Sequence, residues 1–267
     1  MCREYPVDTI GWIFSMFASQ LLEVVIVAAF AGVLLGVIGG GGGATYVILL
    51  TFVLGLPVER AIGTALALST VTALAGVLGH WRNGNVDRQS ALYLGVSAAV
   101  GVVGGASLIQ HLSPDLFRYL MVTAFVLTGL MSISRIRQVK EYSKPTVTRR
   151  WMLLPWGLGT GFVSGAFGLT GTTPLSSFLV SFAQLSPAIA VGTTLTVVLV
   201  TSVVGATVYF QSIDFSLLLI LGFGSVTGAY LGSKMTSRIS KRALAITLAV
   251  LTLAFGIYLA FHFTGFG

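Results

Sequence analysis

Ten apolar segments follow one another along this chain, separated by short polar loops. They cover roughly residues 20–39, 44–55, 58–80, 90–110, 114–134, 151–169, 172–185, 187–209, 214–232 and 240–262. A helix needs about 20 apolar residues to cross a hydrocarbon core of about 30 Å, and eight of the segments are long enough. The sequence therefore predicts an all-α polytopic membrane protein with about 8–10 transmembrane segments, whose main partner is the lipid bilayer.

Two of the segments are too short for a full untilted crossing, namely 44–55 and 172–185. Each follows a glycine-rich break, at Gly39–Gly43 in the first case and at Gly165–Gly171 in the second. Short spans and re-entrant half-helices are both compatible with this pattern.

An internal repeat sets the predicted domain organisation. Gly36, Gly39 and Gly42 recur 129 residues later as Gly165, Gly168 and Gly171, and Ala61-Ile62-Gly63-Thr64 recurs at the same offset as Ala190-Val191-Gly192-Thr193. Two motifs in one register indicate a duplication. We expect an N-terminal surface segment (1–20), a first transmembrane repeat (21–134), a basic cytoplasmic linker (135–150) and a second transmembrane repeat (151–267).

The number of segments and the charges both favour inverted repeats. If the short segments count as crossings, each repeat has five segments, an odd number, and the second copy is inverted relative to the first. If they are re-entrant, each half has four spans and the charge pattern is harder to explain. The linker carries Arg135, Arg137, Lys140, Lys144, Arg149 and Arg150 against Glu141. The positive-inside rule places such a loop in the cytoplasm.

Composition excludes several classes of protein. Only 9% of the residues are charged, and the net charge of +7 comes from short loops rather than from one basic face, so no nucleic-acid partner is expected. Cys2 is the single cysteine, which rules out a disulfide framework and a paired metal–thiolate site. With no serine–histidine–aspartate arrangement or metal cluster in view, we expect neither an enzyme nor a bound cofactor or metal.

The two glycine-rich breaks are the first candidate substrate site. A broken helix exposes backbone N–H groups inside the membrane, and the positive end of its dipole favours an anion. Threonines beside the breaks add hydroxyl donors. The candidate residues are Gly40, Gly41, Gly42, Gly43 and Thr45 in the first half, and Thr170, Gly171, Thr172 and Thr173 in the second.

The duplicated Ala-aliphatic-Gly-Thr motif supplies the other candidates, Gly63 with Thr64 and Gly192 with Thr193. Pseudo-symmetry leads us to expect both threonines at one central site. No charged residue lies deep inside a segment, so a carboxylate relay has no evident place. His80 is expected to be an interfacial residue at the end of its span.

The chain resembles the TauE/SafE family of sulfite exporters and sulfonate-related permeases. The resemblance rests on the glycine run Gly39–Gly43, the motif Ala61-Ile62-Gly63-Thr64 and the loop Gly84-Asn85-Val86-Asp87, and it covers about residues 25–262. It implies a secondary transporter in the cytoplasmic (inner) membrane of a bacterium, with sulfite or a related small organosulfur anion as its substrate. Alternating access around the glycine-broken helices is the expected mechanism.

Other readings of the sequence stay open at this stage. The lack of buried charge is compatible with a passive anion channel, and glycines used only for packing are compatible with a membrane scaffold or assembly protein. The glycine-rich segments 90–110 and 214–232 are equally compatible with packing inside one chain and with a homodimer.

Overall fold

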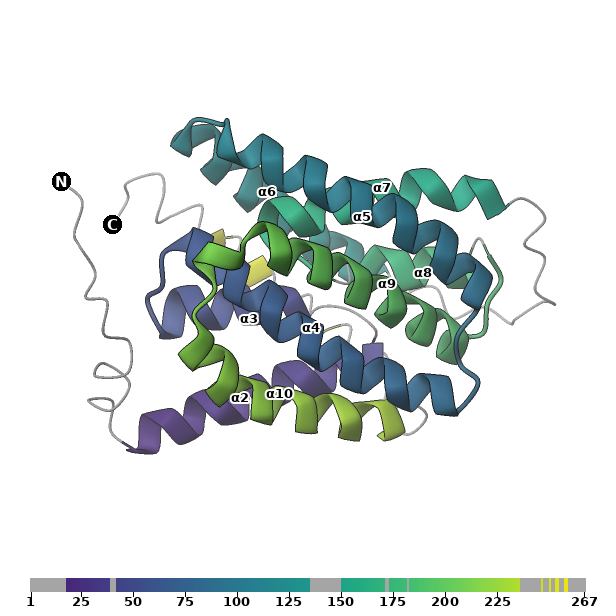
Figure 1. The fold of residues 1–267 in the computed structure, drawn as a ribbon, viewed down its shortest axis with the longest axis horizontal. Coiled ribbons are helices and arrows are strands. Elements are labelled where there is room, and N and C mark those ends of the chain that lie inside the picture. The colour runs from purple at the N-terminus through teal and green to yellow at the C-terminus, as the bar shows by residue number, and fades with distance from the viewer. Residues whose placement is uncertain are drawn as a thin grey trace.

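The computed structural model describes residues 18–38, 42–134, 150–170, 173–181 and 183–235, together with a few positions between 246 and 258. The described helices are α2 (Ala18–Ile38), α3 (Gly42–Ile48), α4 (Val58–Arg82), α5 (Arg88–Gln110), α6 (Pro114–Ser134), α7 (Leu153–Phe167), α8 (Thr173–Ser181), α9 (Pro187–Val208) and α10 (Phe215–Met235). A π-helical turn at Leu49–Val53 continues α3, and single 3₁₀ turns lie at Arg150–Met152 and Phe210–Ser212. Figure 1 shows the long helices lying along one common direction. The prediction of an all-α protein is confirmed.

Among the residues that the structure describes, four helices are long and apolar enough to cross a membrane, by length and composition: α4, α5, α9 and α10. In contrast, α3 has seven residues and α8 has nine. At 1.5 Å per residue, α8 rises only about 13 Å, less than half of a bilayer core of about 30 Å. The two short segments predicted after the glycine-rich breaks are therefore short helices.

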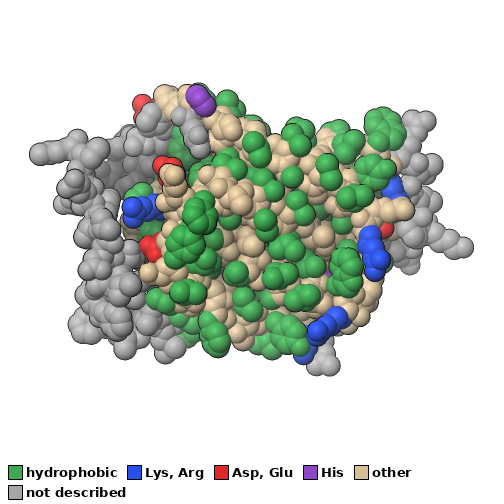
Figure 2. All heavy atoms as spheres, in the orientation of Figure 1, with side chains coloured by type: hydrophobic (Ala, Val, Ile, Leu, Met, Phe, Trp, Pro, Cys, Tyr) green, Lys and Arg blue, Asp and Glu red, His purple; other side chains and the backbone are tan. Residues whose placement is uncertain are grey.

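The surface shows how the protein sits in a membrane. Figure 2 shows an apolar band across the middle of the face in view, with charged side chains towards the two ends. On α10, Leu219 and Phe223 are each 78% exposed. Exposing such large apolar side chains is unfavourable in water but not in lipid. Residues Arg82 and Lys234 lie together at the ends of α4 and α10, while Glu59 and Asp214 lie near the opposite end of α4. These features are those of an integral membrane protein.

Glycines hold two pairs of helices in backbone contact. A Cβ atom at Gly161 of α7 would overlap the carbonyl oxygen of Ala98 of α5, and one at Gly228 of α10 would overlap that of Ala29 of α2. Such close approach is possible only without a side chain. In both pairs, residues further along one helix contact residues further along the other, so α5 runs parallel to α7 and α2 runs parallel to α10.

The glycines at four-residue spacing therefore serve packing within one chain. Gly32 and Gly36 of α2 contact α10, and Gly224, Gly228 and Gly232 of α10 contact α2. A homodimer would need another surface.

At the centre, α4 lies against α9 in the opposite direction. Gly63, near the start of α4, contacts Tyr209 and Ser212 beyond the end of α9, while Gly192, near the start of α9, contacts His80 and Asn85 at the end of α4. These two helices hold corresponding positions in the two halves of the sequence. They provide the framework around which the short helices α3 and α8 are placed.

Candidate functional site

The two breaks in the helices meet each other. A Cβ atom at Gly43 would overlap Thr170 Oγ1 and would lie 2.6 Å from both the Gly168 carbonyl oxygen and the Thr170 nitrogen. Helix α7 ends here because Gly168 adopts the left-handed conformation (φ 69°), which a glycine takes without strain. Segments more than 120 residues apart in the sequence are thereby joined at backbone level.

A hydroxyl of α4 lies at the same point. The Ser69 Oγ and Thr170 Oγ1 atoms are 2.9 Å apart and share a hydrogen bond, and both side chains are buried. Ser69 is the twelfth of the 25 residues of α4. If α4 spans the membrane from end to end, the junction of the two breaks therefore lies near mid-depth.

A tyrosine extends this polar region along α4. The Tyr46 hydroxyl lies 3.0 Å from Thr72 Oγ1, and the whole Tyr46 side chain is buried. Thr72 donates its own proton to the Leu68 carbonyl oxygen one turn back, so it accepts from Tyr46. Sequence reasoning missed Tyr46. A signal was available, since a tyrosine one turn after a glycine break in an apolar segment needs a polar partner.

The candidates around the breaks fall into two groups. Gly42, Gly43 and Thr45 are buried in α3, and Thr170 is buried beside them. Thr173 begins α8. The remaining four lie outside the described residues: Gly40, Gly41, Gly171 and Thr172.

The structure does not bring Thr64 and Thr193 together. Thr64 Oγ1 accepts a hydrogen bond of 3.0 Å from the Asp214 backbone nitrogen, and Thr193 Oγ1 accepts one of 3.0 Å from the Asp87 nitrogen. Sixteen residues of α4 separate Thr64 from His80, which lies beside Gly192, and this corresponds to a rise of about 24 Å. The expected single central site for both threonines is therefore not formed. Each one instead joins a central helix to the loop before α10 or α5.

A second pair of hydrogen bonds follows the same pattern. His80 Nε2 lies 3.2 Å from the Gly36 carbonyl oxygen, and the Tyr209 hydroxyl donates to the Gly165 carbonyl oxygen at 3.0 Å. Both partners of one bond stand 129 residues after those of the other. His80 is only 1% exposed, so it is a buried tether between α4 and α2 rather than the expected interfacial residue.

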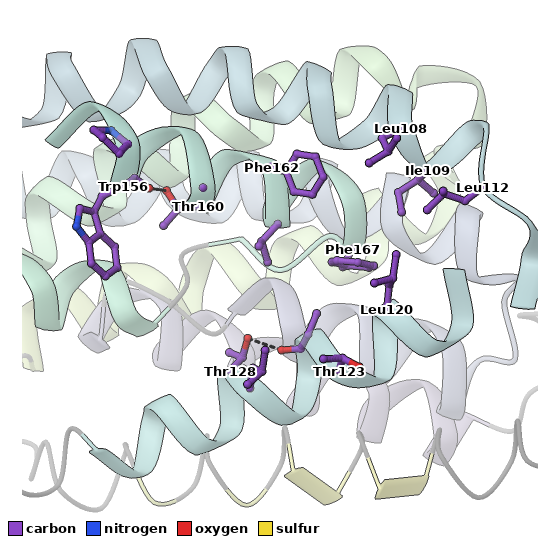
Figure 3. Close-up of a pocket in the computed structure, with 15 residues that line it drawn as sticks. Leu108, Ile109, Leu112, Leu120, Thr123, Thr128, Trp156, Thr160, Phe162 and Phe167 are labelled. Carbon is purple, nitrogen blue, oxygen red and sulfur yellow. Dashed lines mark hydrogen bonds between the residues drawn. The ribbon is translucent and has the colours of Figure 1, made fainter. Parts of the chain in front are cut away.

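A groove between α5, α6 and α7 has a different chemistry. It has a volume of about 530 Å³ and is lined mainly by leucine, phenylalanine and other apolar residues, among them Phe162 and Phe167 (Figure 3). The hydroxyls of Thr123 and Thr160 donate to carbonyl oxygens of their own helices. This groove suits an apolar chain and offers little to an anion.

Interrupted helices that meet halfway along their neighbours, inside a helical membrane protein, are the construction used by secondary transporters. The class of protein is thus a membrane transporter. The chain belongs to the TauE/SafE family: residues 24–259 match the family described as Sulfite exporter TauE/SafE.

Named relatives agree with this class. The chain is 31% identical to the probable membrane transporter protein YdhB of Bacillus subtilis (strain 168) over 246 residues, which cover 89% of this chain and 99% of that protein. It is 27% identical to the probable membrane transporter protein YjnA of the same organism, over 89% of this chain and 99% of that protein. A more distant relative is the probable membrane transporter protein MJ0441 of Methanocaldococcus jannaschii, 23% identical over 90% of this chain and 95% of that protein. No solved structure matches the chain.

Proposed function

We propose that this transporter exports sulfite or a related small organosulfur anion across the cytoplasmic membrane of a bacterium, by alternating access around the junction of the two breaks. The observation that carries the proposal is the contact of Gly43 with Gly168 and Thr170, beside Ser69 at the middle of α4. Backbone amides and hydroxyls at such a junction are ligands for an anion, and the buried position requires a change of shape for release.

The two halves act as inverted repeats in this proposal. Its support is that α4 and α9, which correspond in the sequence, run in opposite directions. The bonds His80–Gly36 and Tyr209–Gly165 also correspond, as do Thr193–Asp87 and Thr64–Asp214. In each pair of corresponding bonds, one bond lies near each end of the central helices α4 and α9. Alternating access opens one end of the protein while the other end is closed, and equivalent bonds at the two ends suit this exchange.

The threonine bonds are proposed as two gates. Thr64 holds the loop before α10 at the end that the charge pattern assigns to the outside, and Thr193 holds the loop before α5 at the cytoplasmic end. The transported anion passes each gate when its bond opens. In this role both threonines act through the shape of the protein and do not have to touch the anion.

Replacing Thr64 with valine should open the outer gate selectively. The Asp214 N–H then loses its acceptor, at a cost of about 1–3 kcal/mol to the closed gate, which shifts the gate equilibrium roughly tenfold. The measurement is the rate at which a thiol reagent labels a cysteine introduced at Ser212, in a protein whose Cys2 has been replaced by serine. We expect faster labelling with Thr64→Val and no change with Thr193→Val. Thr70→Val is the control, because its hydroxyl donates to the Leu66 carbonyl oxygen of its own helix. Equal labelling in all variants would contradict the gate.

Flux into liposomes that carry the purified protein tests the function itself. We expect saturable sulfite flux with counterflow, driven by either an imposed voltage or an imposed pH gradient. Unsaturable flux without counterflow would show a passive anion channel. Folded protein that moves neither sulfite nor an organosulfonate above the level of empty liposomes would refute the proposal and favour a scaffold.

A further inference from the structure

The apolar groove between α5, α6 and α7 runs lengthwise along α7. Four of its lining residues, Trp156, Thr160, Val163 and Phe167, recur at spacings of four, three and four residues and so share one face of α7. Figure 3 shows Trp156 and Phe167 towards opposite ends of this row. The distance from Trp156 to Phe167 corresponds to a rise of about 17 Å. On the other wall, Leu127 of α6 is 52% exposed, so the groove is open to the surrounding lipid.

The groove is too narrow for another helix. Its volume of about 530 Å³, spread over a length of about 17 Å, gives a mean cross-section of about 30 Å² and a width of about 6 Å. A helix with its side chains is about 10–12 Å across. Packed carbon atoms lie only about 4 Å apart, so a single hydrocarbon chain fits where a helix does not.

The lining offers no free hydroxyl to a ligand. Its three threonines are Thr123, Thr128 and Thr160, and each hydroxyl donates to a carbonyl oxygen of its own helix. A peptide segment or a polar ligand would leave its own polar groups without partners here, which is costly. An acyl chain has no polar groups to satisfy, so the lining favours a lipid.

Positive charge and an exposed tryptophan lie at the end of the groove that the charge pattern assigns to the cytoplasm. Arg150 and Trp151 belong to the 3₁₀ turn that leads into α7, and this turn packs against α5. Trp151 is 59% exposed, as is typical of tryptophan at a membrane interface. Arg150 precedes Trp156 by six residues, or about 10 Å, which suits the headgroup of a lipid whose chain enters the groove at Trp156. Anionic lipids are attracted to such a cation at the cytoplasmic leaflet.

We propose that this groove binds one acyl chain of an anionic phospholipid from the cytoplasmic leaflet, with the lipid phosphate beside Arg150 and the chain along α7. The site does not depend on which solute the protein transports. Phe117 of α6 stacks on Phe167, with ring centroids 6.1 Å apart, and closes the far end of the groove. The bound chain holds α6 against α7, the helix that ends at the second glycine break.

Gly159 gives a direct way to block the groove. It lines the groove on α7, and in the described part of the chain no atom of another segment lies within 4 Å of an added Cβ. The ring in Gly159→Phe would therefore occupy the space of the acyl chain. Gly104→Phe is the matched control, because Gly104 on α5 is equally open but lies outside the lining.

Native mass spectrometry of the purified protein with added phosphatidylglycerol or phosphatidylcholine tests the site. We expect wild-type protein to retain one phosphatidylglycerol. Gly159→Phe should weaken that binding about tenfold or more, since several methylene groups lose their contacts, and Gly104→Phe should not change it. Arg150→Gln should weaken phosphatidylglycerol binding about fivefold with little change for phosphatidylcholine.

Three results would overturn the site. The first is equal retention of phosphatidylglycerol by Gly159→Phe and Gly104→Phe. The second is an equal effect of Arg150→Gln on the two lipids, which would remove the anionic headgroup. The third is a wild-type dimer in gel filtration that Gly159→Phe dissociates, which would assign the groove to a second copy of the chain.

A measurement on the unblocked groove covers the case in which Gly159→Phe does not fold. Phosphatidylglycerol with brominated chains is added to the protein in detergent, and tryptophan fluorescence is recorded. One equivalent should quench the signal to saturation, and Trp156→Phe should lose most of this quenching although Trp12, Trp81 and Trp151 remain. Quenching that does not saturate, or that is the same in Trp156→Phe, would overturn the proposal.

Discussion

Replacing Gly43 with alanine should reduce sulfite flux by about tenfold or more. The added methyl group would overlap Thr170 Oγ1 and would lie too close to the Gly168 carbonyl oxygen and the Thr170 nitrogen. The last two are backbone atoms, which cannot move aside as a side chain can. Since the contact joins α3 to the end of α7, relief requires the two breaks to move apart. Misplaced ligands at a binding site cost transport even when the fold survives.

Gly104→Ala is the matched control for this change. Gly104 lies on α5 with no atom of another segment within 4 Å of an added Cβ, so its replacement should leave flux unchanged. Flux into liposomes is measured for both variants at equal amounts of folded protein, as judged by gel filtration. Wild-type flux with Gly43→Ala would show that the junction of the breaks is not the transport site.

Replacing Gly161 with alanine should strongly reduce the stability of the protein. A Cβ atom there would overlap the carbonyl oxygen of Ala98, so α7 could no longer lie against α5. Forcing atoms into a packed interface costs about 1–3 kcal/mol, and more when the obstacle is backbone. We expect a lower melting temperature in detergent and less folded protein.

The same helix provides the comparison. Gly159, two residues earlier, has open space around an added Cβ, and Gly159→Ala should keep or slightly raise stability because alanine favours the helix. The test compares the melting temperatures of Gly161→Ala and Gly159→Ala, measured by tryptophan fluorescence. Equal values would mean that α5 and α7 do not hold their packing in the membrane.

Much of the fold could be predicted because its signals are local. Apolar length located the described helices, and the glycine runs located the ends of α2 and α7. The glycines spaced by four also indicated helix packing, since only close approach requires that pattern. The partners of these helices could not be predicted, because the glycine pattern of one helix does not identify the helix that packs against it.

The position of Thr64 shows why part of the site escaped prediction. Equivalent residues of two antiparallel helices meet only if they lie near the middle of those helices. Thr64 is in the second turn of α4, so its counterpart Thr193 is at the far end of the pair. Ser69, at the midpoint, was the residue that the sequence pattern should have favoured.

The crossed pairing of α2 with α10 and of α5 with α7 also constrains how the chain is made. Helix α2 leaves the ribosome about 200 residues before α10, and α5 leaves it before α7. During that interval the nascent first half exposes its glycine grooves to lipid without their partners. Neither half should therefore be stable when it is synthesised alone, and the protein should become resistant to protease only after translation has passed α10.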